Sequence, residues 1–522
     1  MKITFLGHAG FLVETDATLL IMDPWVSDSG AFDGGWFQFP CNHQMGDIII
    51  EKLQSNGDKK KVYVYVSHEH KDHFDKLFLK SIEKFNFEYI IPRFRRTLLF
   101  DEIRSFSEKE ILLFDDGQEL QVSSSERVIV YSDDSELNRD SAVCFQSGNY
   151  TFLNLNDCKI HDRLGLIKKS LGRIDVLAAQ YSGATWHPTC YDYSDEEYSR
   201  ISKRKIVTKF ENTARAIELC EAGYYIPSAG PPCFLDPDTI HINFERDNIF
   251  PREGKLLKFL ERRLRNSATN VQIMLPDDSL LLSDETLFLR GTLDVISDEN
   301  YRDYILQYAQ RYQSFFYNLK RPVEGENFLR LIDYLVKEIS AKLANFKSRD
   351  RIDRPLYLGF FNQEQMVKVD FVKGVVTLSK AMSESNYYSM KVNPSDIQRI
   401  KDGFLTWEDF SLSFRMRLNR EPDVYQTLIQ GFLILEKDDL NFFCDSVLEL
   451  ENKSEKITVE VGGSRYRINR FCPHQGADMK FSWEEDNRYI VCPRHGWRFD
   501  VTRNGTCMEN GCSIDSFPLE ED

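Results

Sequence analysis

Two short motifs near the C-terminus constrain the fold of this chain more than any other feature. Cys472-Pro-His474 and Cys492-Pro-Arg-His495 each place one thiol and one imidazole close together. Thiolates and imidazoles are strong ligands for transition metals, so each motif offers one ligand of each type. Because 17 residues lie between His474 and Cys492, a hairpin over 479–481 and 489–491 is expected to bring two loops to one metal centre.

The spacing Cys-x-His…Cys-x-x-His resembles that of Rieske domains of the oxygenase-associated type. Other residues complete the pattern: Gly476, Gly496, Trp497, Phe499 and the Asn504-Gly505 turn. Small residues after the histidines let backbone amides approach the bridging sulfurs of a cluster. The resemblance implies a [2Fe-2S] cluster whose ligands are Cys472, His474, Cys492 and His495. A structural zinc site with the same four ligands is the alternative.

The remaining cysteines carry no disulfide pattern. High-potential Rieske proteins of respiratory complexes have an extra cysteine in each cluster loop, but here 475–477 and 496–497 contain none. The resemblance therefore implies a low-potential electron donor. Cys507 and Cys512 lie beyond the loops, and the chain has 11 cysteines in total, so we interpret those outside the cluster as reduced thiols.

A second ligand-rich segment lies near the N-terminus. Residues 61–67 have the β-branched and aromatic character of a strand and lead into His68-Glu-His70-Lys-Asp72-His73. On an extended segment His68 and His70 would point to one side and bind one metal. Asp72 and His73 on the following turn would bind a second. Adjacent metals can share a solvent molecule and activate water or dioxygen.

This hexad resembles the signature of the metallo-β-lactamase superfamily. The opening Gly7-His8-Ala9-Gly10 and the segment Asp23-Pro24-Trp25 resemble the branch that contains ascorbate-phosphate lactonases and N-acyl phosphatidylethanolamine phospholipases. The resemblance implies an αββα sandwich with the metal ligands at the rim of a sheet. His8 is expected to line the pocket, or else to cap a strand turn. Asp23 is expected to orient a ligand histidine.

The match is incomplete at two histidine positions. By resemblance the bridging carboxylate falls at Asp157, whereas Asp140 stands where the third histidine ligand would be. The segment 224–230, where the last histidine should follow a strand, contains none. Three histidines remain open as substitutes: His161, His187 and His241. Replacing imidazoles by oxygen ligands shifts preference from zinc towards a harder metal such as iron.

One family joins a Rieske domain to a metallo-β-lactamase fold, the iron-dependent CMP-N-acetylneuraminate hydroxylases. The resemblance includes the spacing from Asp140 to Asp157-Cys158, Ala229-Gly230, and the stretches 405–408 and 414–425. In the animal members the Rieske domain comes first, whereas here it comes last. The architecture is therefore similar but permuted, and the substrate stays open among amides, amines and sugar nucleotides.

Composition is that of an ordinary globular chain of 522 residues, 42% hydrophobic and 13% aromatic, which predicts two or three domains. No apolar run reaches the ~20 residues that span a bilayer, and the N-terminus lacks a leader pattern, so we expect a cytoplasmic protein. A net charge of −16 disfavours nucleic acid and anionic membranes as partners. Arginines that could form a local basic patch are Arg93, Arg95, Arg96, Arg415, Arg417 and Arg420.

Three domains are predicted: a metallo-β-lactamase-like domain over 1–245, a mainly helical region over 246–430, and an all-β Rieske domain over 431–522. The periodicity indicates strands within 356–377. Helices are expected over 194–221, 253–265, 298–318 and 326–346, the first opened by a Ser194/Glu197 capping box.

The leading functional hypothesis is an iron-dependent oxygenase, specifically a hydroxylase of a small molecule. Electrons would come from an external reductase or ferredoxin, because the chain has no G-x-G-x-x-G fingerprint. They would pass from the cluster to one or two iron ions held by His68, His70, Asp72, His73, Asp140 and Asp157. The residues predicted to act in catalysis are His8, Asp72 and Asp157.

Two alternatives remain. The chain could be a metal-dependent hydrolase, a lactonase or phosphodiesterase, using zinc or manganese with a redox-sensing Rieske domain. It could also be an electron-transfer protein with a degenerate lactamase-like scaffold. If the Rieske domain docks on a neighbouring subunit, the protein is a homo-oligomer.

Overall fold

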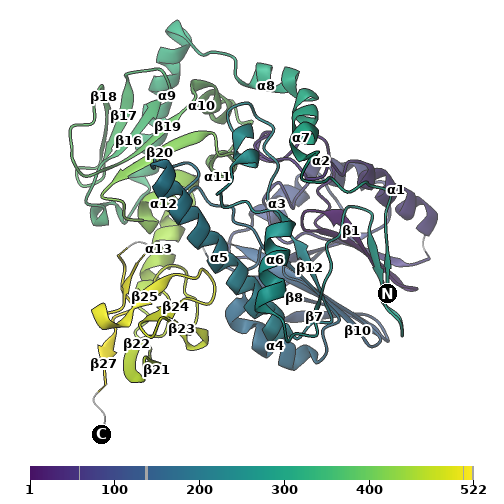
Figure 1. Cartoon of the computed structure of the whole chain (residues 1–522). Helices are drawn as coiled ribbons and strands as arrows, with labels where there is room; N and C mark the ends of the chain where they lie inside the picture. The colour runs from purple at the N-terminus through teal and green to yellow at the C-terminus, as the bar shows by residue number, and fades with distance from the viewer. Residues whose placement is uncertain (58, 136–138, 509–510, 520–522) are drawn as a thin grey trace. The chain divides into compact units, whose positions relative to one another are not determined.

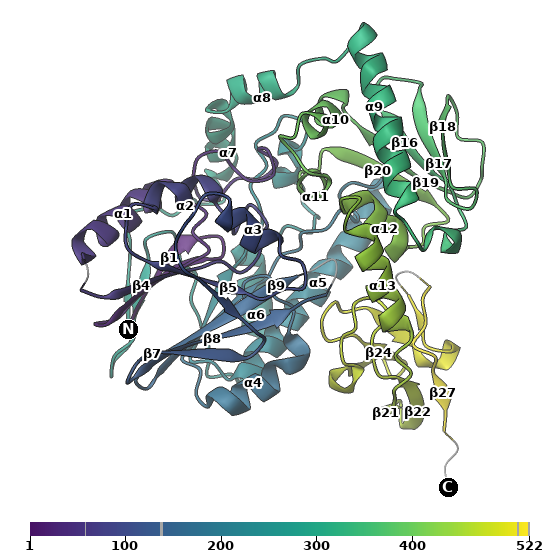
Figure 2. The same ribbon diagram turned by 180° about the vertical axis from the view of Figure 1, so that it is seen from behind.

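The computed structural model of the chain describes residues 1–57, 59–135, 139–508 and 511–519 (Figures 1 and 2). The described chain forms two compact units. The first contains Met1–Ala184, Lys203–Leu235 and Ile240–Tyr308, and the second contains Thr185–Ser202, Asp236–Thr239 and Ala309–Asp522. The chain therefore leaves the first unit and returns to it twice.

Two mixed β-sheets form the centre of the first unit. One has the order β15-β14-β1-β2-β3-β4-β5-β6 and the other β13-β12-β11-β10-β9-β8-β7. The strands of the first sheet are β1 (Lys2–Gly7), β2 (Gly10–Glu14), β3 (Thr18–Met22), β4 (Lys61–Tyr65), β5 (Glu88–Pro92), β6 (Ile111–Phe114), β14 (Ser279–Leu281) and β15 (Leu287–Leu289). Those of the second are β7 (Gln118–Ser123), β8 (Glu126–Asp133), β9 (Asp140–Ser147), β10 (Tyr150–Asn154), β11 (Val176–Gln180), β12 (Tyr224–Ser228) and β13 (Asn270–Val271).

Alternating side chains bury both faces of these sheets. In β1 and β2, Ile3 and Phe11 join a core between the sheets, whereas Leu6 and Leu12 join a core beneath the outer helices, as the two-residue period of a strand requires. Helices α1 (Gln44–Asn56), α2 (Lys76–Ile82) and α3 (Leu98–Arg104) cover the first sheet, and α4 (Leu164–Leu171), α5 (Asp195–Cys220) and α6 (Glu253–Arg263) cover the second (Figure 2). The four layers confirm the predicted αββα sandwich.

The first unit extends beyond the predicted boundary at residue 245. Strand β14 pairs antiparallel with β1, with Ile3 opposite Leu280, and β13 pairs parallel with β12. These late strands belong to the sandwich because each one forms backbone hydrogen bonds with a strand of one of the two sheets. The 246–308 segment is therefore part of the αββα unit and not of a separate helical region.

The second unit contains a five-stranded sheet in the order β18-β17-β16-β19-β20. Its strands are β16 (Leu356–Phe360), β17 (Met366–Asp370), β18 (Val375–Ser379), β19 (Tyr387–Val392) and β20 (Met416–Glu421). The helix expected over 298–318 is two helices, because Tyr312 has non-helical angles (φ −108°, ψ 9°). Most of α7 (Tyr301–Gln310) belongs to the first unit, and α8 (Gln313–Leu319) belongs to the second. The other helices are α9 (Gly325–Ala344), α10 (Pro394–Lys401), α11 (Trp407–Leu412), α12 (Thr427–Ile434) and α13 (Leu440–Glu451).

The C-terminal part of this unit is built mainly from short strands, as predicted, but the helix α13 lies within the range 431–522 that was predicted to be all-β. One sheet has the order β21-β22-β27 and another β23-β24-β25-β26. The bounds are β21 (Lys456–Val461), β22 (Ser464–Asn469), β23 (Trp483–Glu485), β24 (Tyr489–Val491), β25 (Arg498–Asp500), β26 (Thr506–Cys507) and β27 (Phe517–Pro518). The predicted hairpin exists, but its first strand is β23. Met479–Phe481 is a 3-10 turn, since the Asp478 side chain accepts the Lys480 backbone N–H.

In the part of the chain that the structure describes, every helix is too short or too polar to cross a bilayer.

Candidate metal centres

The first candidate centre lies in the αββα unit, where loops after several strands carry polar side chains. The turn after β1 carries His8, β3 leads to Asp23, β4 leads to the hexad, and β10 leads to Asp157. Two of these residues adopt left-handed backbone angles, His8 at φ 51° and Asp23 at φ 41°. Such conformations cost free energy in residues other than glycine and are concentrated at functional sites.

His73 is the central residue of this centre. Its Nδ1 donates a hydrogen bond to Oδ2 of Asp23 over 2.8 Å. Its Nε2 lies 3.7 Å from Oδ2 of Asp72 and 3.8 Å from Oδ2 of Asp157. Two groups of side chains close enough to hold a metal share this imidazole: His8 with Asp72 and His73, and His68 with His73 and Asp157.

The division of the hexad into two metal sites differs from the predicted one. His68 and His70 do contact each other, Nε2 to Nδ1 over 2.9 Å, but His70 belongs to neither group. As predicted, Asp72 and His73 lie on a turn, in which the backbone N–H groups of His73 and Phe74 both bond to the carbonyl of His70. This turn carries His73 back towards His68, so the two histidines belong to one candidate metal site and not to two different sites.

The two predicted carboxylates occupy different positions. Asp157 belongs to one group and accepts a hydrogen bond of 2.7 Å from Nε2 of Gln180. Asp140 belongs to neither group, and its Oδ1 lies 3.2 Å from Nδ1 of His68. Asp140 therefore contacts the edge of an imidazole, which is how carboxylates orient metal-binding histidines.

His8 enters the centre from the other side. Its Nε2 lies 3.1 Å from Oδ2 of Asp72, and its carbonyl accepts the backbone N–H of Ala229, just after β12. His8 thus lines the site, as one of the two interpretations predicted. The remaining candidates, His161, His187 and His241, lie outside both groups. His187 belongs to the second unit and contacts Tyr193, and His241 lies 3.5 Å from Glu245.

Buried carboxylates give this centre a strongly negative field. Burial opposes a charge on His73, but Asp72 and Asp23 outweigh it and raise the pKa of His73 to about 10. Burial likewise opposes ionisation of Asp72, but the charge on His73 and the hydrogen bond to His8 hold the pKa of Asp72 below its usual range. Burial raises the pKa of Asp140 to about 6. The same field favours a bound cation.

These residues fit a metal ion. Nε2 of His73 and Oδ1 of Asp72 are buried without a hydrogen-bond partner among the described residues, and buried polar atoms of this kind normally have one. Imidazole nitrogens and carboxylate oxygens are suitable donors for iron, manganese or zinc. Sequence reasoning missed Gln180 and Ser67, which hold Asp157 and Asp23. Of the two, Ser67 would have been easier to identify from the sequence, because it lies directly before the hexad.

The second candidate centre consists of two matching loops in the C-terminal part. In each loop the cysteine N–H bonds to a carbonyl five residues later, Ala477 or Trp497, and the cysteine carbonyl accepts the N–H of a glycine. Those glycines, Gly476 and Gly496, have φ of 70° and 66°, which glycine adopts at the least cost. The loops therefore present their ligands in equivalent ways.

The predicted ligands pair between these loops, thiol with thiol and imidazole with imidazole. Both thiols are fully buried, Cys472 and Cys492 each at 0% exposure. The rings of His474 and His495 lie edge to face with centroids 4.4 Å apart, and Trp497 stacks on His474 at 3.9 Å. The two thiols and two imidazoles can thus face one shared group. The site fits a cluster that takes one ligand of each type from each loop.

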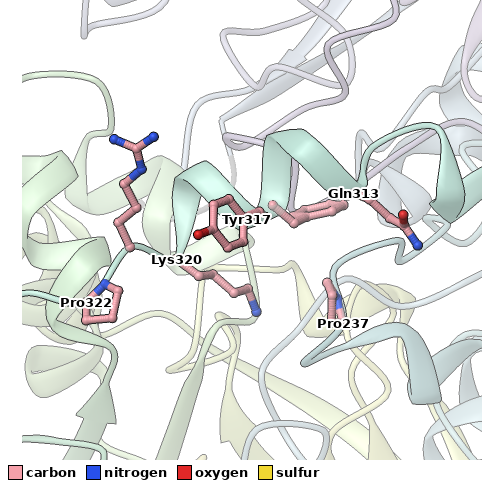
Figure 3. Close-up of a pocket in the computed structure, with 7 residues that line it drawn as sticks. Pro237, Gln313, Tyr317, Lys320 and Pro322 are labelled. Carbon is pink, nitrogen blue, oxygen red and sulfur yellow. The ribbon is translucent and has the colours of Figure 1, made fainter.

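Four of the six arginines that were predicted to form basic patches pair with acidic neighbours. Arg93 and Arg95 pair with Asp115 and Asp134. Pairs are also made by Arg415 with Asp396 and by Arg420 with Asp423. A cavity of about 380 Å³ in the second unit contains no candidate metal or cluster ligand (Figure 3). Its lining residues are Pro237, Gln313, Phe316, Tyr317, Lys320, Arg321 and Pro322.

Comparisons with known proteins identify the C-terminal part. A family model described as Rieske [2Fe-2S] domain matches residues 433–518. A Mycolicibacterium smegmatis protein named as a Rieske 2Fe-2S iron–sulfur protein is 28% identical, over 97% of this chain and 98% of its own. The cytidine monophosphate-N-acetylneuraminic acid hydroxylase of Mus musculus is 22% identical, over 82% of this chain and 72% of its own.

The crystal structure of CmlA, a diiron β-hydroxylase from Streptomyces venezuelae, superposes with a TM-score of 0.36 and 14% identity, over 55% of this chain and 54% of that one. The chain combines an αββα unit with a C-terminal Rieske [2Fe-2S] domain, and its sequence resembles that of the CMP-N-acetylneuraminate hydroxylases.

Proposed function

We propose that this chain is an iron-dependent oxygenase in which the Rieske cluster supplies electrons to an iron centre in the αββα unit. The observation that carries the proposal is the presence, in one chain, of a Rieske domain and a second centre with unsatisfied buried donors on His73 and Asp72. Hydrolysis transfers no electrons, so a tethered electron donor favours redox chemistry. The mouse relative is itself named as a hydroxylase.

Each residue then has a defined role at the cluster. Cys472 and Cys492 would bind one iron of the cluster through sulfur, and His474 and His495 would bind the other through nitrogen. The imidazole ligands raise the reduction potential above that of an all-cysteine cluster. Trp497 holds the ring of His474 by stacking at 3.9 Å.

At the second centre, His68, His73 and Asp157 would hold one iron ion, and His8 and Asp72 would hold another or bind substrate. Iron bound there supplies the redox chemistry with dioxygen. Asp23 keeps the proton of His73 on Nδ1 and so leaves Nε2 for the metal. Gln180 fixes one oxygen of Asp157 and leaves the other facing His73.

The substrate is proposed to be a small molecule of the amide, amine or sugar-nucleotide class. Electrons are proposed to arrive from a separate reductase or ferredoxin, because no dinucleotide-binding fingerprint occurs in the sequence. The competing hydrolase function uses the same donors with zinc or manganese, and metal analysis separates the two.

The test is the metal and acid-labile sulfide content of anaerobically purified full chain, with electron paramagnetic resonance after reduction. We expect a Rieske signal and iron clearly above the two atoms of one cluster. The double variant His68→Ala, His73→Ala should lose only the excess iron. The exposed His241 provides the control His241→Ala, which should lose none. Zinc in place of the excess iron, with turnover independent of dioxygen, would establish the hydrolase instead.

A further inference from the structure

An aromatic side chain from outside the Rieske range contacts a cluster histidine. Tyr425 precedes the matched residues 433–518, yet its ring lies edge-on to His474 with centroids 5.8 Å apart. It also lies 5.8 Å from Trp497, which stacks on the same imidazole. His474 is therefore enclosed by two aromatic rings from different parts of the second unit.

The hydroxyl of Tyr388 connects Tyr425 to the five-stranded sheet. It donates to the carbonyl of Val424 over 2.9 Å and accepts the N–H of Gln426 over 3.2 Å, the backbone groups on either side of Tyr425. It accepts a further hydrogen bond of 3.2 Å from Nη1 of Arg420. Tyr388 is 2% exposed, and these three bonds satisfy its hydroxyl completely.

Arg420 continues the contacts to a loop. Its guanidinium lies over the ring of Tyr191 at 4.8 Å and over that of Tyr388 at 5.9 Å. Tyr191 is held beside β20, because the backbone groups of residues 190 and 192 bond to those of Leu418. Tyr191 also stacks on Tyr193 at 5.9 Å. Rings and hydrogen bonds thus run without a break from His474 to the 187–193 loop.

We propose that this column, formed by Tyr425, Tyr388, Arg420 and Tyr191, is the electron conduit that leads out of the Rieske cluster. The inference rests on the proposed oxygenase function. One electron leaves the reduced cluster through His474, which returns the cluster to its oxidised form, and a ferric ion at the second centre gains that electron and becomes ferrous. The column residues are neither oxidised nor reduced, because they serve as a tunnelling path.

Two features support this assignment. Electron tunnelling weakens steeply across gaps, and packed rings joined by hydrogen bonds leave few gaps. The far end of the column, Tyr191, also lies in the segment that connects β11 to α5, 11 residues after the end of β11 along the chain. The last residue of β11, Gln180, hydrogen-bonds Asp157 of the candidate metal centre.

The experiment uses the full chain loaded with cluster and iron. The protein is reduced anaerobically and mixed with dioxygen, and reoxidation of the cluster is followed by stopped-flow absorbance. The variants are Tyr425→Leu, which removes the ring, and Tyr425→Phe, which keeps it. Tyr317, 77% exposed in the same unit, provides the control Tyr317→Leu. The double variant His68→Ala, His73→Ala measures direct oxidation of the cluster by dioxygen.

We expect Tyr425→Leu to slow the fast phase roughly tenfold, equivalent to about 1.4 kcal/mol of barrier. Its cluster potential and paramagnetic spectrum should be unchanged. Tyr425→Phe and Tyr317→Leu should match the unsubstituted chain. If Tyr425→Leu does not fold, Tyr388→Phe removes only the bridging hydroxyl and should also slow the fast phase.

Unchanged rates in both Tyr425→Leu and Tyr388→Phe would overturn the conduit and leave the oxygenase proposal intact. A slower rate with a shifted cluster potential would overturn it too, because Tyr425 would then act by positioning His474. If the unsubstituted chain reoxidises no faster than the His68/His73 double variant, the oxygenase function fails, and the conduit fails with it.

Discussion

Asp23 accepts a hydrogen bond from Nδ1 of His73 over 2.8 Å, and this contact determines which nitrogen of the imidazole faces the metal centre. Asp23 is itself held by the N–H and hydroxyl of Ser67. The carboxylate is fully buried, so it cannot turn to another partner in solvent. The position of His73 between Asp72 and Asp157 therefore depends on a residue that does not reach the metal.

The substitution Asp23→Asn should weaken metal binding at this centre roughly 10- to 100-fold, the usual cost of losing such a partner. The amide keeps the shape but loses the charge that stabilises the proton on Nδ1. Metal affinity is measured by competition with a chelator. The exposed Asp115 near Arg93 provides the control Asp115→Asn. Unchanged affinity in Asp23→Asn would show that the hydrogen bond does not orient His73 for a metal.

The cluster and the second metal centre should be independent. Cys472→Ala removes a buried ligand thiol and should abolish the visible absorption of the cluster while leaving the excess iron in place. Cys512 lies outside the ligand pairs and is half-buried, so Cys512→Ala should preserve both. Absorption and metal content are measured on the same samples. Simultaneous loss of both metals in Cys472→Ala would contradict independence.

Lys342 gives a stability change that depends on pH. Its side chain is fully buried in α9, with Nζ 4.7 Å from the centre of the Trp407 ring and 5.4 Å from that of Phe432. Burial disfavours the charged amine and lowers its pKa to about 8, although Glu436 and Glu338 oppose this. Between pH 8 and the ordinary value of 10.5, the unfolded chain binds the proton more tightly, so stability rises with pH.

Lys342→Met should therefore stabilise the second unit by about 3 kcal/mol below pH 8, and the gain should shrink as the pH approaches 10. Thermal unfolding midpoints at pH 7 and pH 9.5 test this. The exposed Lys337 on the same helix provides the control Lys337→Met, which should change neither midpoint. An equal gain at both pH values would show that the buried charge is not the cause.

Gly431 in α12 allows close packing against α13. A Cβ at this position would lie 2.2 Å from Cε1 of Phe443, well inside van der Waals contact. Gly431→Ala should destabilise the second unit by roughly 1–3 kcal/mol, measured by denaturant unfolding. Gly254 in α6 has nothing within 4 Å, so Gly254→Ala should be neutral or slightly stabilising. Adding Phe443→Leu to Gly431→Ala should recover part of the loss.

Local spacing was sufficient to single out the two Cys/His motifs and the hexad, because these features depend on residues close together in the sequence. The αββα class followed from the resemblance of the hexad and its neighbours to a known superfamily. The sharing of His73 by two groups was not predictable, since it depends on the distances in space between side chains of separate loops. His8 and Asp72 lie in two different loops, and the sequence of neither loop indicates that the two side chains come into contact. The predicted domain boundary at residue 245 was wrong, because nothing in the local sequence of β14 indicates that it pairs with β1.

The conduit residues illustrate the same limit. Arg420 and Tyr425 lay in a stretch that the sequence singled out by resemblance, with no indication of their partners. Tyr191 and Tyr388 come from separate segments, and their proximity arises only when β19, β20 and the loop after β11 have packed.

The pairing of β1 with β14 also affects how the protein is made. Lys2 is opposite Leu281, so β1, the first strand to be synthesised, can pair with β14 only after most of the unit has been synthesised. At about 5–20 residues per second, the ribosome leaves β1 without this neighbour for many seconds. His8, which follows that strand, therefore gains its final surroundings late. We expect nascent chains that stop before residue 281 to need chaperone protection and to acquire no metal at the N-terminal centre.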